Sequence, residues 1–269
     1  MITFKQYLQE ARYRTDISNE RAIDLLKDHC SDALKNIDTP LIRGTKTSTE
    51  QAYLVHGELG DGRSSAWSDS NFYTVILDEV NGPAGYPLRS KSVIMSNWAG
   101  FHNIVSYARG KGGVYAMFPY DGVKIGVCPS YDMWEGPAFT IGESKRRRTI
   151  NDWNDWFLHM NLDESSYEAL VHSIEDTLED PERAAKETGK PEGFFDELVE
   201  TFDPGKVDEQ LHKAYSASNQ EFDLVDTRTV YDISNERECW TSGKCVAIRL
   251  GLTKADAHAA IANLKEMLK

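Results

Sequence analysis

Several features are scarce or missing in this 269-residue sequence, and each absence argues against a class of protein. The four cysteines form no Cys-x-x-Cys pair and show no zinc-type spacing, which is typical of reduced thiols in a cytosol-like compartment. No apolar run approaches the length of a membrane span and no secretory signal pattern occurs. We therefore expect a soluble protein that has no membrane partner.

The usual catalytic signatures are also missing. No Gly-x-Gly-x-x-Gly opens a helix, and Gly110-Lys111-Gly112-Gly113 is too short for a phosphate loop, which argues against a Rossmann fold. The absence of Gly-x-Ser-x-Gly argues against a hydrolase nucleophile elbow. The histidines form no His-x-x-x-His or Glu-x-x-His ligand pair, so we predict no metal.

Positive charge is in deficit. The net charge is −13, which argues against a direct, sequence-independent grip on nucleic acid and favours a protein or small-molecule partner. A local exception is the basic run 145–148, which is followed by Trp153 and Trp156. This mixture either contacts nucleic acid or an acidic target, or forms a solvated face, and we favour the solvated face.

Two glutamates one residue apart, Glu236 and Glu238, lead into an apolar, β-prone run. In an extended backbone, residues i and i+2 share a face, so both carboxylates can reach into one cleft. Paired carboxylates suit chemistry on a sugar, where one stabilises a developing oxocarbenium ion and the other orients or deprotonates a nucleophile. The alternative is a solvated turn before a strand.

Two further segments bring polar side chains to strand ends. Residues 39–45 read as a short strand that carries Arg43, with Gly44 allowing close backbone approach. The planar fork of an arginine grips phosphate or ribose oxygens, although an ordinary surface arginine is the commoner case. Residues 92–96 have strand character, and a short helix is expected over 99–108.

Together, three motifs resemble those of Arg-Ser-Glu type ADP-ribosyltransferases. Leu41-Ile42-Arg43-Gly44 is similar to the family's apolar-Arg-Gly strand, and Glu236-Arg237-Glu238 is similar to its Glu-x-Glu loop. Ser96 is similar to its Ser-x-Ser strand, but Met95 interrupts the Ser/Thr cluster, so Ser92 is the alternative. The resemblance implies an α+β fold, with an ADP-ribosyltransferase-like split β core, flanking helices and a helical insertion.

The resemblance also implies an NAD-dependent mono-ADP-ribosyltransferase, with NAD as co-substrate. In that role Arg43 binds the nicotinamide-side ribose and phosphate, and Ser96 braces the cleft. Glu238 hydrogen-bonds the ribose 2′-hydroxyl and stabilises the cation as nicotinamide leaves, while Glu236 orients the acceptor, expected to be an arginine. The alternatives are an NAD glycohydrolase that transfers to water and a non-catalytic protein that binds and inhibits a host factor.

The first eleven residues resemble the capsid-targeting peptide of internal head proteins of T-even-type phages. The segment begins Met-x-Thr-Phe-Lys, and Leu8-Gln9-Glu10 before Ala11 is similar to a prohead-protease cleavage site. This implies cleavage at Glu10/Ala11, packaging in the capsid interior and entry into the host cytoplasm with the DNA. The implied partners are the phage prohead protease and a host protein target, such as RNA polymerase or the translation machinery.

The remaining pattern predicts the element order and the domains. Ser18 is expected to cap a helix that runs to about Asn36, and Thr253 to cap the last helix. Residues 58–71 read as a loop, 72–77 as a strand, and 113–119 with 123–129 as a hairpin around Tyr120-Asp121-Gly122. Helices are expected after Ser166, around Leu198 and around Leu211. The expected domains are a cleavable peptide 1–10, a catalytic domain in two parts, 11–143 and 221–269, and an acidic helical insertion 144–220.

Overall fold

The computed structural model describes residues 14–45, 50–57, 70–108 and 112–269. The expected targeting peptide, its cleavage site and most of the expected loop 58–71 lie outside these residues. The chain divides into two compact units. The first unit comprises Met1–Arg63, Tyr86–Asp132 and Asp223–Lys269, and the second comprises Ser64–Gly85 and Met133–Phe222. The second unit therefore contains the expected insertion 144–220 together with residues 133–143, 221–222 and 64–85.

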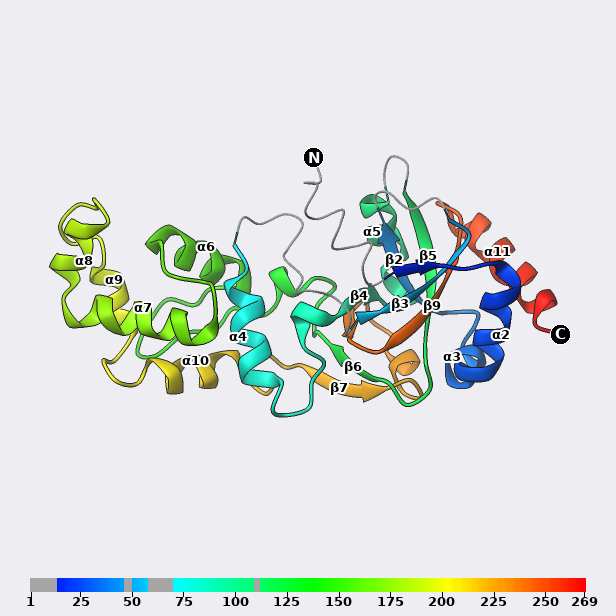
Figure 1. Ribbon diagram of the computed structural model, residues 1–269, viewed down its shortest axis with the longest axis horizontal. Coiled ribbons are helices and arrows are strands. Elements are labelled where there is room, and N and C mark those ends of the chain that lie inside the picture. Colours follow the sequence, from blue (N-terminus) through cyan, green and yellow to red (C-terminus); the bar gives the residue numbers. More distant parts are fainter. Residues whose placement is uncertain (1–13, 46–49, 58–69, 109–111) are drawn as a thin grey trace. The chain divides into compact units, whose positions relative to one another are not determined.

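The first unit is built on an antiparallel sheet, so the chain combines α and β structure within one unit (Figure 1). Its order is β1-β3-β9-β5-β2-β4-β8-β6-β7. The strands of the described residues are β1 (Arg14–Asp16), β2 (Leu41–Thr45), β3 (Ala52–His56), β4 (Val93–Ser96), β5 (Gly113–Pro119), β6 (Lys124–Val127), β7 (Asp223–Asp226), β8 (Glu238–Thr241) and β9 (Lys244–Arg249).

The backbone pairing of the sheet is shortest between β2 and β4. Strand β2 pairs with β5 along its whole length, from Leu41 to Thr45, and β4 pairs with β8 from Val93 to Ser96. Between β2 and β4, in contrast, the register within the described residues has the single pair Ile42↔Ser96. The two halves of the sheet are thus joined through this one pair of residues.

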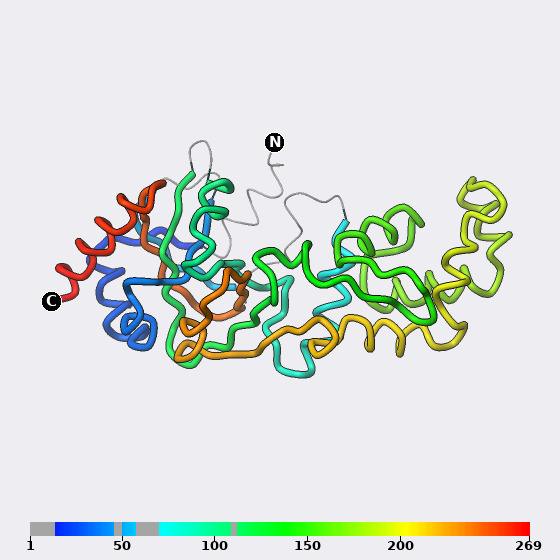
Figure 2. Tube along the Cα trace, turned by 180° about the vertical axis from the view of Figure 1, so that it is seen from behind, coloured from blue at the N-terminus to red at the C-terminus, as the bar shows by residue number. Residues whose placement is uncertain are grey.

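Helices cover one face of this sheet. They are α2 (Asn19–His29), α3 (Ser31–Lys35), α5 (Phe101–Tyr107) and α11 (Lys254–Met267). Figures 1 and 2 both show α11 beside α2 and α3, and the three share one apolar cluster with strand residues such as Ile42 and Val246. A second cluster on the opposite face includes Leu41, Tyr115 and Cys239. The alternation of strand side chains between two faces produces these two clusters.

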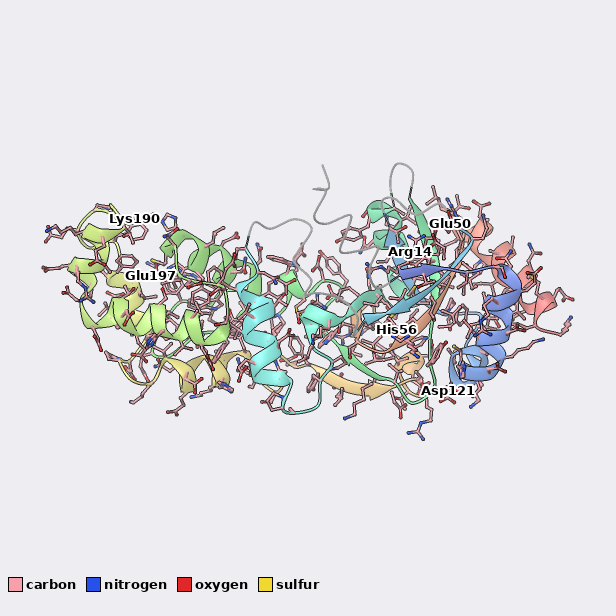
Figure 3. The ribbon with its side chains drawn as sticks, viewed as in Figure 1. Arg14, Glu50, His56, Asp121, Lys190 and Glu197 are labelled. Atoms are coloured by element: carbon pink, nitrogen blue, oxygen red, sulfur yellow. The ribbon has the colours of Figure 1, made fainter. Side chains whose placement is uncertain are left out.

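The caps of α2 and α11 confirm the sequence prediction. Ser18 Oγ accepts from Arg21 N, and Thr253 Oγ1 accepts from Asp256 N. The helix predicted to run to Asn36, however, is interrupted at Cys30, whose ψ is 34°. The chain restarts as α3 because the carboxylate of Asp121 accepts from Ser31 N and Asp32 N, a cap supplied from a distant segment (Figure 3).

The predicted hairpin over 113–129 is wrong, although its strands and its turn are present. Gly122 has φ +77° and Val123 N donates to Tyr120 O, as expected of a tight turn. Both edges of β5 are occupied, by β2 and β9, while β6 pairs with β7 and β8. The turn therefore sends the chain from one half of the sheet to the other.

The second unit is helical in the described residues. Its helices are α4 (Phe72–Asn81), α6 (Ile150–Met160), α7 (Tyr167–Glu179), α8 (Pro181–Glu187), α9 (Asp196–Thr201) and α10 (Val207–Tyr215). The predictions of α7, α9 and α10 are confirmed, with Ser166 capping α7. The strand predicted over 72–77 is wrong: Phe72, Tyr73, Ile76 and Leu77 are buried at helical spacing.

The basic run 145–148 is mostly the solvated face that we expected, since Lys145, Arg146 and Arg147 are exposed, and only Arg148 is half-buried. Arg148 pairs with Glu197 of α9, labelled in Figure 3, and its guanidinium lies 4.8 Å from the ring centre of Trp153. Arg146 pairs with the same carboxylate at 2.8 Å but stays exposed. Since Trp153 is fully buried, it cannot stack on a nucleic acid base.

Candidate functional site

The three strands that carry the sequence motifs are consecutive in the sheet. Strand β2 carries Arg43, β4 ends at Ser96 and β8 begins at Glu238. The register runs Ile42↔Ser96↔Glu238, so the three motif strands meet where the two halves of the sheet are joined. We call this place, with Arg43, Ser96 and the loop 233–237, the β2–β4–β8 junction.

Ser96 and Glu238 are a direct cross-strand pair, and both are buried. Cross-strand partners project from the same face of a sheet with their Cβ atoms about 5 Å apart. The alternative serine, Ser92, lies at the opposite end of β4, where its hydroxyl donates to Leu88 O at 2.7 Å. The structure thus places Ser96, and not Ser92, beside Glu238.

Arg43 lies at the junction but starts from the other face of β2. Its neighbour Ile42 belongs to the helix-covered cluster, so alternation directs Arg43 toward the side of Leu41 and Cys245. The guanidinium reaches from β2 to β4, where Nη1 donates to Ile94 O at 2.9 Å. It therefore bridges the two halves of the sheet at the place where backbone pairing between them ends.

Glu236 is half-buried and is held by α5. Its Oε1 accepts from Asn103 Nδ2 at 2.6 Å. Gly100, at the start of that helix, allows this approach: a Cβ at Gly100 would overlap Ser96 Oγ and lie 3.0 Å from Glu236 Oε1. Ser96 Oγ and Glu236 Oε1 therefore both lie close to Gly100, and Ser96 is also the cross-strand partner of Glu238, so the serine links the two glutamates.

The loop that carries Glu236 is fixed by a buried asparagine. Asn97 Nδ2 donates to Ile233 O and Asn235 O, at 3.0 and 2.5 Å, and its Oδ1 accepts from Arg237 N at 3.1 Å. Asn97 N also donates to Arg237 O at 3.2 Å. The residue next to the motif serine thus holds the loop 233–237, which contains Glu236 and leads directly into Glu238.

Glu238 is paired differently, with a buried arginine. Arg89 belongs to the 3₁₀ turn Arg89–Lys91 before β4, and its Nη2 forms an ion pair with Glu238 Oε1. Their side chains are 5% and 10% exposed. One glutamate of the pair therefore faces a guanidinium, and the other faces a neutral amide.

Sequence reasoning missed Arg89, Asn97 and Asn103. Each acts through a partner more than 130 positions away along the chain, for example Asn103 with Glu236 and Asn97 with Arg237. The only local signal is their place in the segments flanking the motif serine. Pairings over such distances require the strand order, which the sequence pattern alone does not supply.

Comparison with family models, curated proteins and solved structures finds no match to this chain. Within the described residues, no three or more His, Cys, Asp or Glu side chains are grouped as metal ligands. No helix of that part of the chain is long and apolar enough to cross a membrane. The function is therefore argued from the geometry of the junction.

Proposed function

We propose that this chain is an NAD-dependent mono-ADP-ribosyltransferase that modifies an arginine of a host protein. The observation that carries the proposal is the convergence of the motifs. Arg43, Ser96 and Glu238 are far apart in the sequence, yet the register Ile42↔Ser96↔Glu238 brings the strands that carry them to one junction, where Ser96 and Glu238 share a face and Arg43 starts from the other face of β2. The Arg-Ser-Glu resemblance requires such a meeting, and unrelated surface motifs do not.

The proposed reaction breaks the bond between nicotinamide N1 and ribose C1′. The bonding electrons leave with nicotinamide, and the ribose becomes an oxocarbenium ion. The Glu238 carboxylate stabilises this cation and accepts from the 2′-hydroxyl, an electrostatic role that suits a buried, held side chain. A guanidinium nitrogen of the acceptor then bonds to C1′ and loses a proton, for which Glu236 is the nearby base.

The charge distribution supports an anionic substrate in the first unit. The second unit contains 24 acidic and 9 basic residues, whereas the first unit contains 19 acidic and 21 basic residues. The chain's negative charge thus belongs to the helical unit, and the unit with the junction is close to neutral. An NAD pyrophosphate approaching Arg43 meets no net repulsion from that unit.

The first eleven residues support the remaining part of the proposal, that the protein is packaged in a phage capsid and enters the host cytoplasm with the DNA. Their similarity to a capsid-targeting peptide is independent of the junction. It gives a reason for a host protein, such as RNA polymerase or a translation factor, to be the target.

The test is incubation of the protein with NAD labelled in its adenylate part and a bacterial lysate. We expect label on protein with the wild type, none with Glu238→Gln, and full labelling with Glu266→Gln, an exposed glutamate of α11. Nicotinamide release without labelled protein would indicate a glycohydrolase. If the wild type neither labels protein nor releases nicotinamide, the proposal is wrong and a non-catalytic binder of a host factor is the better reading.

A further inference from the structure

Arg89 is unusual because an arginine is rarely buried. Arg89 is 4% exposed, and its guanidinium faces the carboxylate of Glu238, which is the catalytic group of the proposed function. Residue 89 matches none of the three sequence motifs. The contacts of Arg89 therefore provide the evidence for its role.

The segment that carries Arg89 is fastened to the same strand as Glu238. Trp240 Nε1 donates to Pro87 O at 2.9 Å, and the Arg89 guanidinium lies 5.5 Å from the Trp240 ring centre. Trp240 packs flat against Gly126, where any Cβ would overlap its ring. Since Glu238 and Trp240 are i and i+2 on β8, both project from one face of that strand.

Stability alone is a weak reason for such a pair. Desolvation of two charges offsets most of their attraction, so apolar residues of similar size commonly replace a buried ion pair without loss of stability. A guanidinium does, however, bind a carboxylate oxygen in a fixed direction, because its donors form a rigid plane. The ion pair between Arg89 Nη2 and Glu238 Oε1 thus favours side-chain orientations of Glu238 in which this oxygen stays beside the guanidinium.

We propose that Arg89 is a positioning residue that holds the Glu238 carboxylate in the orientation needed for cleavage of the nicotinamide–ribose bond. The inference rests on the proposed function. It also separates the two glutamates: Glu238 is locked by a charged partner, while Glu236 keeps a neutral amide partner suited to a group that exchanges acceptors. The contribution of Arg89 is realised in the transition state, so it changes turnover more than substrate binding.

The experiment compares Arg89→Met, which removes the charge at similar length, with Arg89→Lys, which retains it. Arg228→Met is the matched control, since Arg228 is 72% exposed and pairs with Asp226 at the surface. Nicotinamide release is measured at varied NAD concentration, together with thermal unfolding of each variant. We expect Arg89→Met to lower kcat at least about 100-fold with KM within about threefold, and Arg89→Lys to have a kcat about tenfold above that of Arg89→Met but still about tenfold below that of the wild type.

Each other outcome decides against the assignment. An unchanged kcat per folded molecule means that Arg89 is only structural, and a raised KM alone means that it only binds NAD. If Arg89→Met fails to fold, Arg89→Lys decides: wild-type kcat or a change in KM alone overturns the inference. Absence of nicotinamide release in the wild type itself overturns the proposed function, and the role of Arg89 with it, which distinguishes the two failures.

Discussion

At the scale of single residues, the two glutamates of the junction differ in what holds them. Glu238 is buried against the Arg89 guanidinium, whereas Glu236 is half-buried and accepts from the Asn103 amide. A charged, desolvated partner resists displacement more strongly than a neutral one. Glu238 is thus suited to a fixed electrostatic role, and Glu236 to contact with an incoming group.

This difference predicts separable effects. We expect Glu236→Ala to lower transfer to protein at least about tenfold more than it lowers NAD cleavage, because it removes the group that orients and deprotonates the acceptor. Labelled protein and released nicotinamide are measured in parallel. Asn103→Ala, which removes the amide partner of Glu236, should change each of these two activities in the same direction as Glu236→Ala, but by a smaller factor. Equal loss of the two activities would show that the glutamates do not divide the roles in this way.

At this scale the sequence pointed to the groups but not to their partners. Glu236, Glu238 and Arg43 are visible because their local contexts are distinctive. Arg89 and Asn103 are not, since an arginine or an asparagine near a helix or turn is ordinarily a surface residue. Their burial depends on the fold around them, which local pattern does not contain.

At the scale of elements, the turn between β4 and α5 holds the loop 233–237. Asn97 is 4% exposed and bonds to three backbone groups of the loop through its side chain. The loop is therefore shaped by a neighbouring element and not by its own sequence. The same hexapeptide, Asp-Ile-Ser-Asn-Glu-Arg, occurs at residues 16–21, where it runs from the end of β1 through the N-cap Ser18 into the first turn of α2.

We accordingly expect Asn97→Ala to destabilise the protein by about 2 kcal/mol or more, because it leaves buried backbone groups without partners. NAD cleavage should fall as well, since Glu238 directly follows the loop. Asn235→Ala is the matched control, because it keeps the carbonyl that Asn97 contacts. Urea denaturation and nicotinamide release measure the two effects, and a wild-type result for Asn97→Ala would contradict this role of Asn97.

Prediction of elements succeeded where caps or a clear period were present, as for α2, α7 and α11. It failed where strand pairing or tertiary contacts decided. The turn at Tyr120–Val123 favours a hairpin, but β5 has better partners in β2 and β9. Residues 72–77 are too short a stretch to separate a strand from one face of a helix, and burial of Phe72 and Ile76 settled the helix.

At the scale of the whole molecule, the interior of the first unit contains cysteine thiols and a tyrosine hydroxyl whose pKa values are raised by burial. Burial raises the pKa of the Cys128 thiol to about 11 and that of Cys245 to about 12. Burial also raises the pKa of Cys30, Cys239 and Tyr231. In the unfolded chain these groups lose their protons nearer pH 8.5 to 10.

Stability should therefore fall in alkali. Above about pH 9 the unfolded state releases protons that the folded state retains, so rising pH favours unfolding, by up to about 1.4 kcal/mol per pH unit for each such thiol. We expect the free energy of unfolding, measured with urea and a reductant, to be at least about 2 kcal/mol lower at pH 10 than at pH 8. Cys128→Ala should reduce the difference, and equal stability at both values would exclude this account.

The total net charge likewise does not reveal how the charged residues are divided between the two units. The sequence showed a net −13 and an acidic stretch, but the near neutrality of the first unit appears only when the discontinuous segments are assigned to their units. Helix α4 illustrates the reason, because it lies far from residues 133–222 in the sequence yet packs against α6 and α10.

The place of β9 also has a consequence for biosynthesis. This strand, Lys244–Arg249, is the last of the described chain, yet it lies in the interior of the sheet, between β3 and β5. On the ribosome, β3 and β5 therefore wait with an open hydrogen-bonding edge while more than a hundred further residues are added. Unpaired edges of this kind attract other chains, so the sheet of this protein can close its inner edges only after nearly the whole chain has been made.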